Sequence, residues 1–351
     1  MAQPGSSISE PAWRYWLALH PDLPRPIGGV KQMHRFAEAL MACGRQATLI
    51  QQEAEFHPGW FVSSVPTTGL KQWQNRSDLS PARDVVVLPE TFLPAIESYG
   101  PGLPKLIFNQ NGAYSFGLDP AQLRQPPAEV LQLYHHPLVA QVLCVSQHDE
   151  RLLAQGFGLG QERVCRLVNG IEAALFRPAG AKRRQIAYMP RKNGRDAAVV
   201  AALLEAQPWW PGWQLVPIHK RSQAEVARIL QQSLVFLAFG HPEGFGLPLA
   251  EALASGCALV GYSGLGGREL FGLGADHGVA LEVAYGDWLG FVEAVAALDR
   301  SLQKQQGAVL QALQAASKAV RAQYSPAAMQ ASVAAALPIW EARLQARLDF
   351  P

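Results

Sequence analysis

The stretch His241-Pro-Glu-Gly-Phe-Gly-Leu-Pro-Leu-Ala-Glu-Ala-Leu-Ala-Ser-Gly256 follows a short apolar run, Leu234–Phe239. An uninterrupted apolar run of this kind is typical of a parallel strand covered on both faces. Pro248 suits the first turn of a helix, where no backbone hydrogen bond is lost, and Gly256 suits the end of that helix. The stretch therefore predicts a strand, a glycine-rich loop and a helix, in that order.

The glycine-rich loop carries residues that suit an anionic ligand with hydroxyl groups. Gly244 and Gly246 have no Cβ, so the backbone can turn tightly and come close to a ligand. The free backbone amides of residues 245–249, at the start of the helix, form an anion site. Glu243 lies in the loop and Glu251 in the first turns of the helix, where carboxylates can accept hydrogen bonds from sugar hydroxyls. The loop therefore suits a nucleotide diphosphate sugar.

On both sides of this stretch, short apolar runs alternate with helical patterns. The expected strands are Tyr15–Leu19, Ala47–Ile50, Asp84–Leu88, Lys105–Phe108 and Gln141–Val145, and then Ile186–Met189, Gln214–Ile218, Leu234–Phe239 and Ala258–Tyr262. The expected helices include Lys31–Cys43, Asp196–Ala206, Gln223–Gln232 and Pro248–Ala254. Two such runs predict an α/β fold of two doubly wound, Rossmann-like domains that face a cleft.

We expect the two domains to meet near the basic stretch Arg177–Gln185, which contains a proline and a glycine. Residues 1–178 would form the N-terminal, acceptor-side domain, and residues 179–326 the C-terminal domain that binds the nucleotide sugar. Ligands of doubly wound sheets bind beyond the carboxyl ends of the strands, so the cleft between the domains is the expected site.

The C-terminal segment, residues 327–351, is rich in alanine and has a helical pattern. Trp340, Leu344 and Leu348 recur every four residues, with Arg343 and Arg347 beside them. We expect this helix to pack back on the N-terminal domain, because only two basic residues flank the apolar stripe. The alternative is a helix on a membrane surface, which would give the protein a peripheral membrane contact.

The composition limits the class of protein. Of the 351 residues, 49% are hydrophobic, and 30 Lys and Arg against 28 Asp and Glu give a formal net charge of +2. This balance excludes a polybasic arm or a broadly cationic surface, so we expect no nucleic-acid partner. Four widely spaced cysteines without a CxxC pair indicate a reduced protein. No apolar run reaches the ~18 residues of a membrane helix, and Met1–Pro11 lacks a secretion-signal pattern, so we expect the cytoplasm or the inner membrane face.

The pattern Glu-Gly-Phe-Gly-Leu-Pro-x-x-Glu-Ala-x-Ala-x-Gly, residues 243–256, resembles the Glu-x7-Glu signature of glycosyltransferase family 4. Members of that family are retaining enzymes of the GT-B fold. Further blocks resemble other parts of the family pattern. Ile27-Gly-Gly-Val30 resembles its N-terminal glycine loop, and Val142-Leu-Cys-Val-Ser146 resembles its final N-domain strand. Val168-Asn-Gly-Ile171 with Phe176-Arg-Pro178 resembles the segment that leads into the second domain, and Gly266-Gly-Arg-Glu269 resembles the loop after the Glu-x7-Glu helix.

The resemblance implies roles for the matching residues. Glu243 would contact hydroxyls of the donor sugar and shape the transition state, and Glu251 would hold the ribose hydroxyls of the nucleotide. The donor phosphates would lie against the backbone of glycines in three loops, with two apolar residues completing the donor site. These donor-site residues are Gly28, Gly29, Gly244, Phe245, Gly246, Leu247, Gly266 and Gly267.

One region departs from the family pattern. The family usually places an Arg and a Lys several residues apart after the first strand of the second domain, where they neutralise the diphosphate leaving group. Here Arg191 and Lys192 are adjacent and follow Pro190. They remain the candidate catalytic cations, since Arg grips phosphate through a planar fork and Lys acts as a point charge. Arg195 is the alternative to one of them.

No metal or other cofactor is expected. The chain contains no Asp-x-Asp pair, through which metal-dependent sugar transferases often hold their ion. In the GT-B arrangement, helix ends and basic side chains replace the metal.

The acceptor side carries a polar segment, Asn109-Gln-Asn-Gly-Ala-Tyr114, directly after an expected strand. Asparagine side chains both donate and accept hydrogen bonds, as sugar hydroxyls require. We therefore take Asn109, Asn111 and Tyr114 as acceptor-side candidates.

The sequence thus favours a retaining, metal-independent transfer of a sugar, with a hexose expected, from a nucleotide diphosphate sugar to a hydroxyl acceptor. The alternatives are a sugar-nucleotide epimerase or hydrolase of the same fold and a non-catalytic sugar-nucleotide-binding protein. The sugar, the base, the acceptor (glycan, lipid or small molecule) and the oligomeric state are not determined by the sequence.

Overall fold

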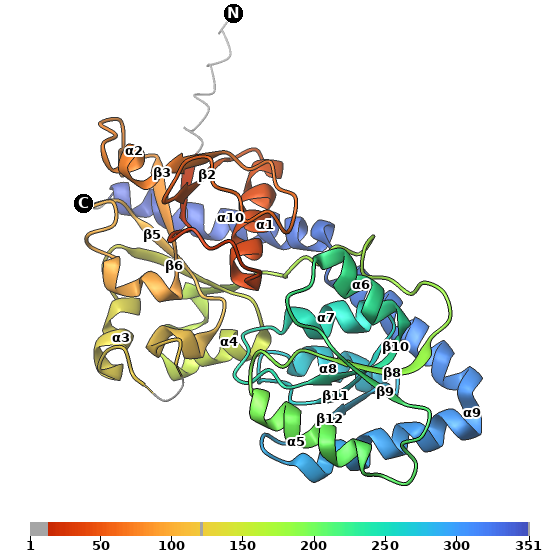
Figure 1. Ribbon diagram of the computed structural model, residues 1–351. Coiled ribbons are helices and arrows are strands. Elements are labelled where there is room, and N and C mark those ends of the chain that lie inside the picture. The colour runs from red at the N-terminus through yellow and green to blue at the C-terminus, as the bar shows by residue number, and fades with distance from the viewer. Residues whose placement is uncertain (1–12, 120–121, 350–351) are drawn as a thin grey trace, which may run out of the picture.

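The computed structural model describes residues 13–119 and 122–349 and arranges them in two lobes (Figure 1). The interpretation of Met1–Pro11 as free of a secretion signal concerns residues outside the described part. The strands are β1 (Arg14–Ala18), β2 (Gln46–Gln51), β3 (Thr67–Gly69), β4 (Asp84–Pro89), β5 (Lys105–Phe108), β6 (Val139–Cys144), β7 (Val164–Arg166), β8 (Arg183–Tyr188), β9 (Gln214–Pro217), β10 (Ser233–Ala238), β11 (Ala258–Gly261) and β12 (Ala280–Glu282). The α-helices are α1 (Gly28–Ala42), α2 (Leu70–Gln74), α3 (Pro127–Tyr134), α4 (Gln147–Arg151), α5 (Gly194–Glu205), α6 (Gln223–Gln232), α7 (Leu247–Ala254), α8 (Arg268–Asp276), α9 (Trp288–Gln323) and α10 (Pro326–Asp349).

Each lobe is built on one parallel sheet. The N-terminal sheet has the order β3-β2-β1-β4-β5-β6-β7 and the C-terminal sheet the order β12-β11-β10-β8-β9. Neighbouring strands are parallel, and the strand order reverses between β1 and β4 in one sheet and between β8 and β10 in the other. Both sheets are therefore doubly wound, which confirms the predicted α/β fold.

The continuous apolar runs form the inner strands because both of their faces are covered. All residues of β6 and β10 are buried. Buried residues on the two faces of the N-terminal sheet belong to separate clusters: Tyr15 and Leu17 pack in one, Trp16 and Ala18 in the other. Each predicted strand is present with its ends shifted by no more than three residues.

Helix α10 returns to the N-terminal lobe and lies beside α1 (Figure 1). Trp340 and Leu344 are buried, and the Trp340 indole Nε1 donates a hydrogen bond of 2.9 Å to the Tyr15 hydroxyl. Glu341 pairs with Arg45 at 2.7 Å. The apolar stripe of the C-terminal helix is thus packed inside the protein, as expected.

The long helix α9 was not predicted from the sequence, and the shortest strands were also missed. Edge strands β3, β7 and β12 each have three residues, too few to show a period. Because β7 pairs with β6, the block Val142–Ser146 does not hold the last strand of its sheet. Strand β8 begins at Arg183, inside the expected connection Arg177–Gln185, because Gln185 pairs with β9. The division of the domains at residue 178 stays a prediction.

Candidate functional site

A pocket opens where the strand order of the C-terminal sheet reverses. Arg191 and Lys192 follow β8, and Glu243 and Gly246 follow β10; all four line the pocket. Neighbouring crossovers leave opposite faces of the sheet at such a point, so a crevice remains beyond the strand ends. The pocket therefore lies where a doubly wound sheet binds its ligand.

Lys192 and Glu243 form an ion pair in this pocket. The Lys192 Nζ lies 3.0 Å from the Glu243 Oε2 and donates a second hydrogen bond of 2.9 Å to the Pro242 carbonyl. The Glu243 backbone amide donates to the Gly264 carbonyl at 2.8 Å. Both side chains keep about a fifth of their surface exposed (20% and 21%), so a ligand can reach them. The pair presents a fixed cation and a fixed hydrogen-bond acceptor side by side.

The glycine-rich loop also forms the contact between the lobes. A Cβ on Gly244 would lie 1.7 Å from the Gln110 carbonyl oxygen of the N-terminal lobe, so no other residue fits there. Gly246, with φ +85°, is the N-cap of α7. Phe245 is buried against the ring of Tyr324, which leaves only its backbone to face a ligand. The loop is thus shaped by packing against protein as much as by a ligand site.

The other two glycine pairs pack closely against this loop. A Cβ on Gly28 would lie 2.9 Å from Leu247 Cδ1, and one on Gly266 would lie 2.0 Å from the Gly244 carbonyl oxygen. Gly29 faces the Gln110 side chain, which donates to the Gly29 carbonyl at 3.2 Å. Gly267 precedes α8, and its backbone amide donates a hydrogen bond of 3.0 Å to the Ser263 carbonyl. All donor-site glycines therefore gather where the lobes meet.

Of the three candidate cations, Arg191 and Lys192 reach the pocket and Arg195 does not. Arg191 is exposed and lines the pocket, whereas the Arg195 guanidinium lies 5.7 Å from the ring centre of Trp288. Asn193, in the left-handed region at φ 48°, donates to the Phe239 carbonyl at 2.7 Å and holds this turn against the end of β10. Sequence reasoning missed Asn193, although Asn is one of the few residues that tolerate this conformation.

Glu251 is buried and contacts a lysine of the other lobe. The Lys31 Nζ, on α1, lies 3.2 Å from the Glu251 Oε1 and 3.0 Å from the Glu172 Oε2. Glu172 also pairs with Arg35 of α1 at 3.0 Å. Lys31 has 1% of its surface exposed and Glu251 8%, so their contact is shielded from solvent, whereas Glu172 and Arg35 are partly exposed. A single lysine in a helical pattern resembles a surface residue, and for that reason the sequence did not reveal it.

Burial and charge act against each other in this network. Burial lowers the pKa of Lys31, but Glu251 and Glu172 outweigh it, so the pKa of the lysine is raised and its cationic form is favoured. Burial raises the pKa of Glu251, and Lys31 opposes that rise. Lys31 is therefore the group that supports an anionic Glu251.

The acceptor-side candidates separate into two groups. Asn111 donates from Nδ2 to the Pro242 carbonyl at 3.3 Å, and Tyr114 lies under Lys192, with Nζ 5.2 Å from the ring centre. Both residues meet the C-terminal lobe beside Glu243. Asn109 is fully buried and donates to Tyr134 and Ser115 instead, so its side chain does not face the cleft. Asn111 and Tyr114 remain acceptor-side candidates.

Two buried carboxyl groups hold the segment that carries Asn111. The amide of Gln110 donates to Glu90 at 2.9 Å, and that of Gly112 donates to Asp149 at 3.3 Å. Burial raises the pKa of Glu90 to about 7 and that of Asp149 to about 7. Neither was singled out in the sequence, where a lone acidic residue carries no signal of burial. These groups position the loop.

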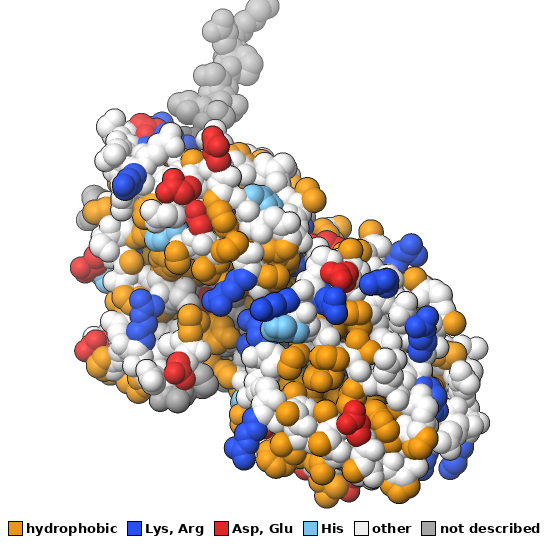
Figure 2. Space-filling view, in the orientation of Figure 1, with side chains coloured by type: hydrophobic (Ala, Val, Ile, Leu, Met, Phe, Trp, Pro, Cys, Tyr) orange, Lys and Arg blue, Asp and Glu red, His pale blue; other side chains and the backbone are white. Residues whose placement is uncertain are grey.

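Basic side chains and a His side chain gather where the two lobes meet (Figure 2). His241, next to the pocket, stacks on Tyr285 with ring centres 4.3 Å apart. Burial, and then the charge of Lys192, lower the pKa of His241. Within residues 13–119 and 122–349, no three metal-ligating side chains lie close enough to hold an ion, and no helix is both long and apolar enough to cross a membrane.

No family model matches the sequence. A segment of 118 residues, 33% of this chain, is 28% identical to an alpha-1,6-glucosyltransferase of Actinobacillus pleuropneumoniae serotype 7 and spans only 34% of that relative's length. Similar solved structures include sucrose-phosphate synthase of Thermosynechococcus elongatus (TM-score 0.70, 14% identity, 94% of this chain and 99% of that one). Another is Anabaena HepE in complex with UDP-glucose (TM-score 0.66, 12% identity, 93% of this chain and 99% of that one). The chain therefore has the two-sheet GT-B type of fold.

Proposed function

We propose that this protein is a retaining glycosyltransferase that resembles family 4 and transfers a sugar, a hexose, from a nucleotide diphosphate sugar to a hydroxyl acceptor. The Lys192–Glu243 pair, set in the pocket at the strand reversal of the C-terminal sheet, carries the proposal. Two similarities support the proposal: the protein shares its fold with HepE, whose structure holds UDP-glucose, and part of its sequence matches a glucosyltransferase.

The donor diphosphate is assigned to the start of α7. Free amides at a helix N-terminus attract phosphate, and the cations of Arg191 and Lys192 line the same pocket. Negative charge grows on the leaving diphosphate as its bond to the sugar breaks, so fixed donors there lower the barrier. This arrangement supplies the stabilisation that a metal would otherwise provide, and we propose that transfer needs none.

Glu243 and Glu251 are assigned to hydroxyl groups. The Glu243 carboxylate is held beside the diphosphate position by Lys192 at 3.0 Å and accepts from the donor sugar. Glu251 accepts from the ribose, with Lys31 as a positioning residue that supports its anionic form. Buried carboxylates that accept charge-assisted hydrogen bonds discriminate well between hydroxylated and deoxygenated ligands.

The acceptor is assigned to the N-terminal side of the cleft, near Asn111 and Tyr114. In the transfer, the bond between the anomeric carbon and the diphosphate oxygen breaks, and a bond from the acceptor oxygen to that carbon forms on the same face. The acceptor proton passes to the leaving diphosphate. No side chain is required as a nucleophile.

Glu243→Gln tests the assignment. The amide keeps the size of the side chain but loses the charge paired with Lys192, so sugar transfer should fall by a factor of about 100 or more while thermal stability changes little. Glu205→Gln, on an exposed face of α5, is the matched control. Wild-type transfer by folded Glu243→Gln would refute the role.

Two further measurements separate the alternatives. Thermal shifts with UDP, GDP, ADP and CMP, each with and without magnesium, identify the base, and UDP is tested first. An NMR time course with the matching donor sugar, with and without acceptors, then distinguishes transfer from hydrolysis or epimerisation. Turnover of donor alone, unchanged by any acceptor, would favour a hydrolase or epimerase. Binding without turnover would favour a non-catalytic protein.

A further inference from the structure

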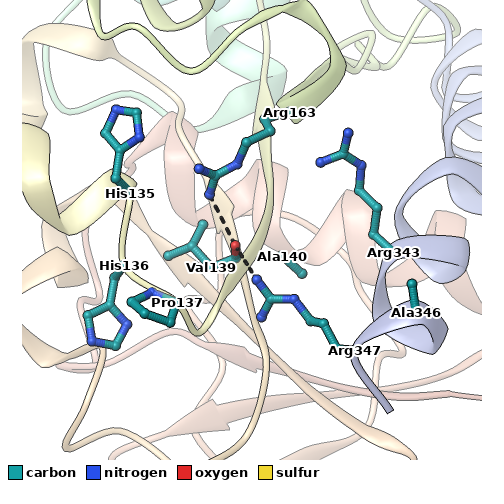
Figure 3. Close-up of a pocket in the computed structure, with 9 residues that line it drawn as sticks. All are labelled: His135, His136, Pro137, Val139, Ala140, Arg163, Arg343, Ala346 and Arg347. Atoms are coloured by element: carbon teal, nitrogen blue, oxygen red, sulfur yellow. Dashed lines mark hydrogen bonds between the residues drawn. The ribbon is translucent and has the colours of Figure 1, made fainter. Parts of the chain in front are cut away.

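A second pocket, of about 280 Å³, lies on the N-terminal lobe beneath the end of α10 (Figure 3). Three arginines line it: Arg163, just before β7, and Arg343 and Arg347, on the last turns of α10. His135 and His136, after α3, line the other side. Segments that are about 200 residues apart in the chain thus bring basic side chains together.

The three guanidinium groups leave most of their hydrogen-bonding capacity unused. Arg163 donates to the Tyr134 and Val139 carbonyls, both at 3.2 Å. Arg347 donates to the Val139 carbonyl at 2.8 Å, and Figure 3 shows the two bonds to Val139. Arg343 makes no hydrogen bond or ion pair with any side chain or backbone group of residues 13–119 or 122–348. Each guanidinium has five N–H donors, so the cluster can grip another acceptor.

No carboxylate balances the charges in the pocket among the residues whose side chains are described, 13–119 and 122–348. No Asp or Glu of these residues lines it. Burial, and then the charge of Arg343, lower the pKa of Arg163, while Glu162 opposes this; burial and the charges of Arg163 and Arg343 lower the pKa of Arg347. Glu97 lies 3.1 Å from the His136 Nε2, outside the arginine cluster. Three like charges held together in this way repel one another unless an anion joins them.

We propose that this pocket binds a phosphate group, held by Arg163, Arg343 and Arg347. Guanidinium forks match phosphate oxygens in pairs, and a tetrahedral dianion has enough oxygens for three such partners. The pocket lies at Val139, the first residue of β6, whereas the proposed transfer site lies beyond the carboxyl ends of the strands. It is therefore a separate site, and its phosphate belongs to a free phosphorylated molecule or to a phospholipid headgroup.

The dipole of α10 does not account for the cluster. A basic residue in the last turn of a helix, as Arg347 is, interacts favourably with the helix C-terminus. Arg163, however, comes from a different element and faces the same space (Figure 3). An anion bound between them would link α10 to the edge of the N-terminal sheet, so binding should raise thermal stability.

Arg343→Gln tests the proposal without disturbing a visible contact, because Arg343 makes no hydrogen bond to the described chain. Sodium phosphate is titrated against wild type, Arg343→Gln and the control Arg300→Gln, an exposed arginine of α9, at constant ionic strength. Calorimetry and thermal shift are both recorded. We expect roughly tenfold weaker phosphate binding in Arg343→Gln, the loss of about one charge-assisted contact, and wild-type binding in the control.

Vesicles identify the source of the phosphate. Co-sedimentation with phosphatidylcholine vesicles, with and without phosphatidic acid, is measured for the same three proteins. If wild type binds the acidic vesicles and Arg343→Gln does not, the phosphate belongs to a lipid headgroup, whether or not free phosphate also binds. A response to free phosphate alone assigns a soluble ligand. If wild type and Arg343→Gln bind phosphate equally and also bind vesicles equally, the proposed phosphate site does not exist. The transfer site is tested separately, by Glu243→Gln.

Discussion

Replacing Lys31 by Met would remove the cation on which a buried carboxyl depends. Lys31 reaches Glu251 at 3.2 Å and Glu172 at 3.0 Å, and burial already raises the pKa of Glu251. Glu172 keeps its contact with Arg35, so it stays anionic. Glu251 loses its only ion-pair partner in the described chain, and we expect it to take up a proton instead of remaining as a buried, unpaired anion.

The magnitude follows from that proton. A carboxyl with an ordinary pKa of 4.5 resists protonation by about 1.4 kcal/mol per pH unit above that value, which sets an upper limit of about 3 kcal/mol at pH 7 and about 1 kcal/mol at pH 5.5 on the loss relative to wild type, where the pKa of Glu251 is already raised. With an unfolding entropy of ~2.1 cal/mol/K per residue over 351 residues, the unfolding midpoint should fall by up to roughly 4 °C at pH 7. The folded variant binds the extra proton, so its deficit must shrink as the pH falls.

The assay is thermal unfolding of wild type, Lys31→Met and the exposed-site control Lys318→Met at several pH values between about 5 and 8. The double variant Lys31→Met/Glu251→Gln, which leaves no buried carboxyl at this position, should recover most of the lost stability and lose the pH dependence. A deficit that is the same at every pH, or that the second substitution does not relieve, would refute this account of the Lys31–Glu251 pair.

Two further predictions concern the contact between the lobes and the loop beneath it. Gly244→Ala places a methyl group 1.7 Å from the Gln110 carbonyl oxygen, so it should lower both the unfolding midpoint and the rate of sugar transfer. The control Gly272→Ala in α8 has open space around its Cβ and should stabilise the protein by about 0.5–1 kcal/mol. Both variants are compared by calorimetry and a transfer assay, and equal effects would contradict the contact between Gly244 and Gln110. Glu90 has a pKa of about 7 in the folded protein against an ordinary 4.5, so wild type loses stability as the pH rises from about 4.5 to 7. Glu90→Gln should remove the part of that loss that Glu90 causes, while the part that Asp149 causes remains, so the midpoint should fall less steeply with pH than in wild type. Identical slopes of midpoint against pH for the two proteins would count against it.

The fold could be predicted from the sequence because its signals are local. Continuous apolar runs such as Leu234–Phe239 mark strands covered on both faces, and the pattern from Lys31 to Cys43 marks a helix. The same is true of the residues of the pocket that follow β8 and β10, since the turn after a parallel strand always lies at the carboxyl edge of its sheet. Glu243 was placed in this way, whereas Arg191 and Lys192 were taken from the resemblance to the family pattern.

Contacts between distant segments carry no such signal, and only the tertiary structure decided them. Asn109 and Asn111 follow the same strand, yet one is buried against Tyr134 and the other meets the opposite lobe, because residues two apart in a turn need not share a direction. In the sequence Lys31 resembles a surface residue, but in the folded protein it contacts Glu251 of α7, which lies 220 positions further along the chain. The sequence by itself determined two doubly wound sheets and the residues at their carboxyl edges; the packing of the lobes determined which of those residues face one another and which charges are buried.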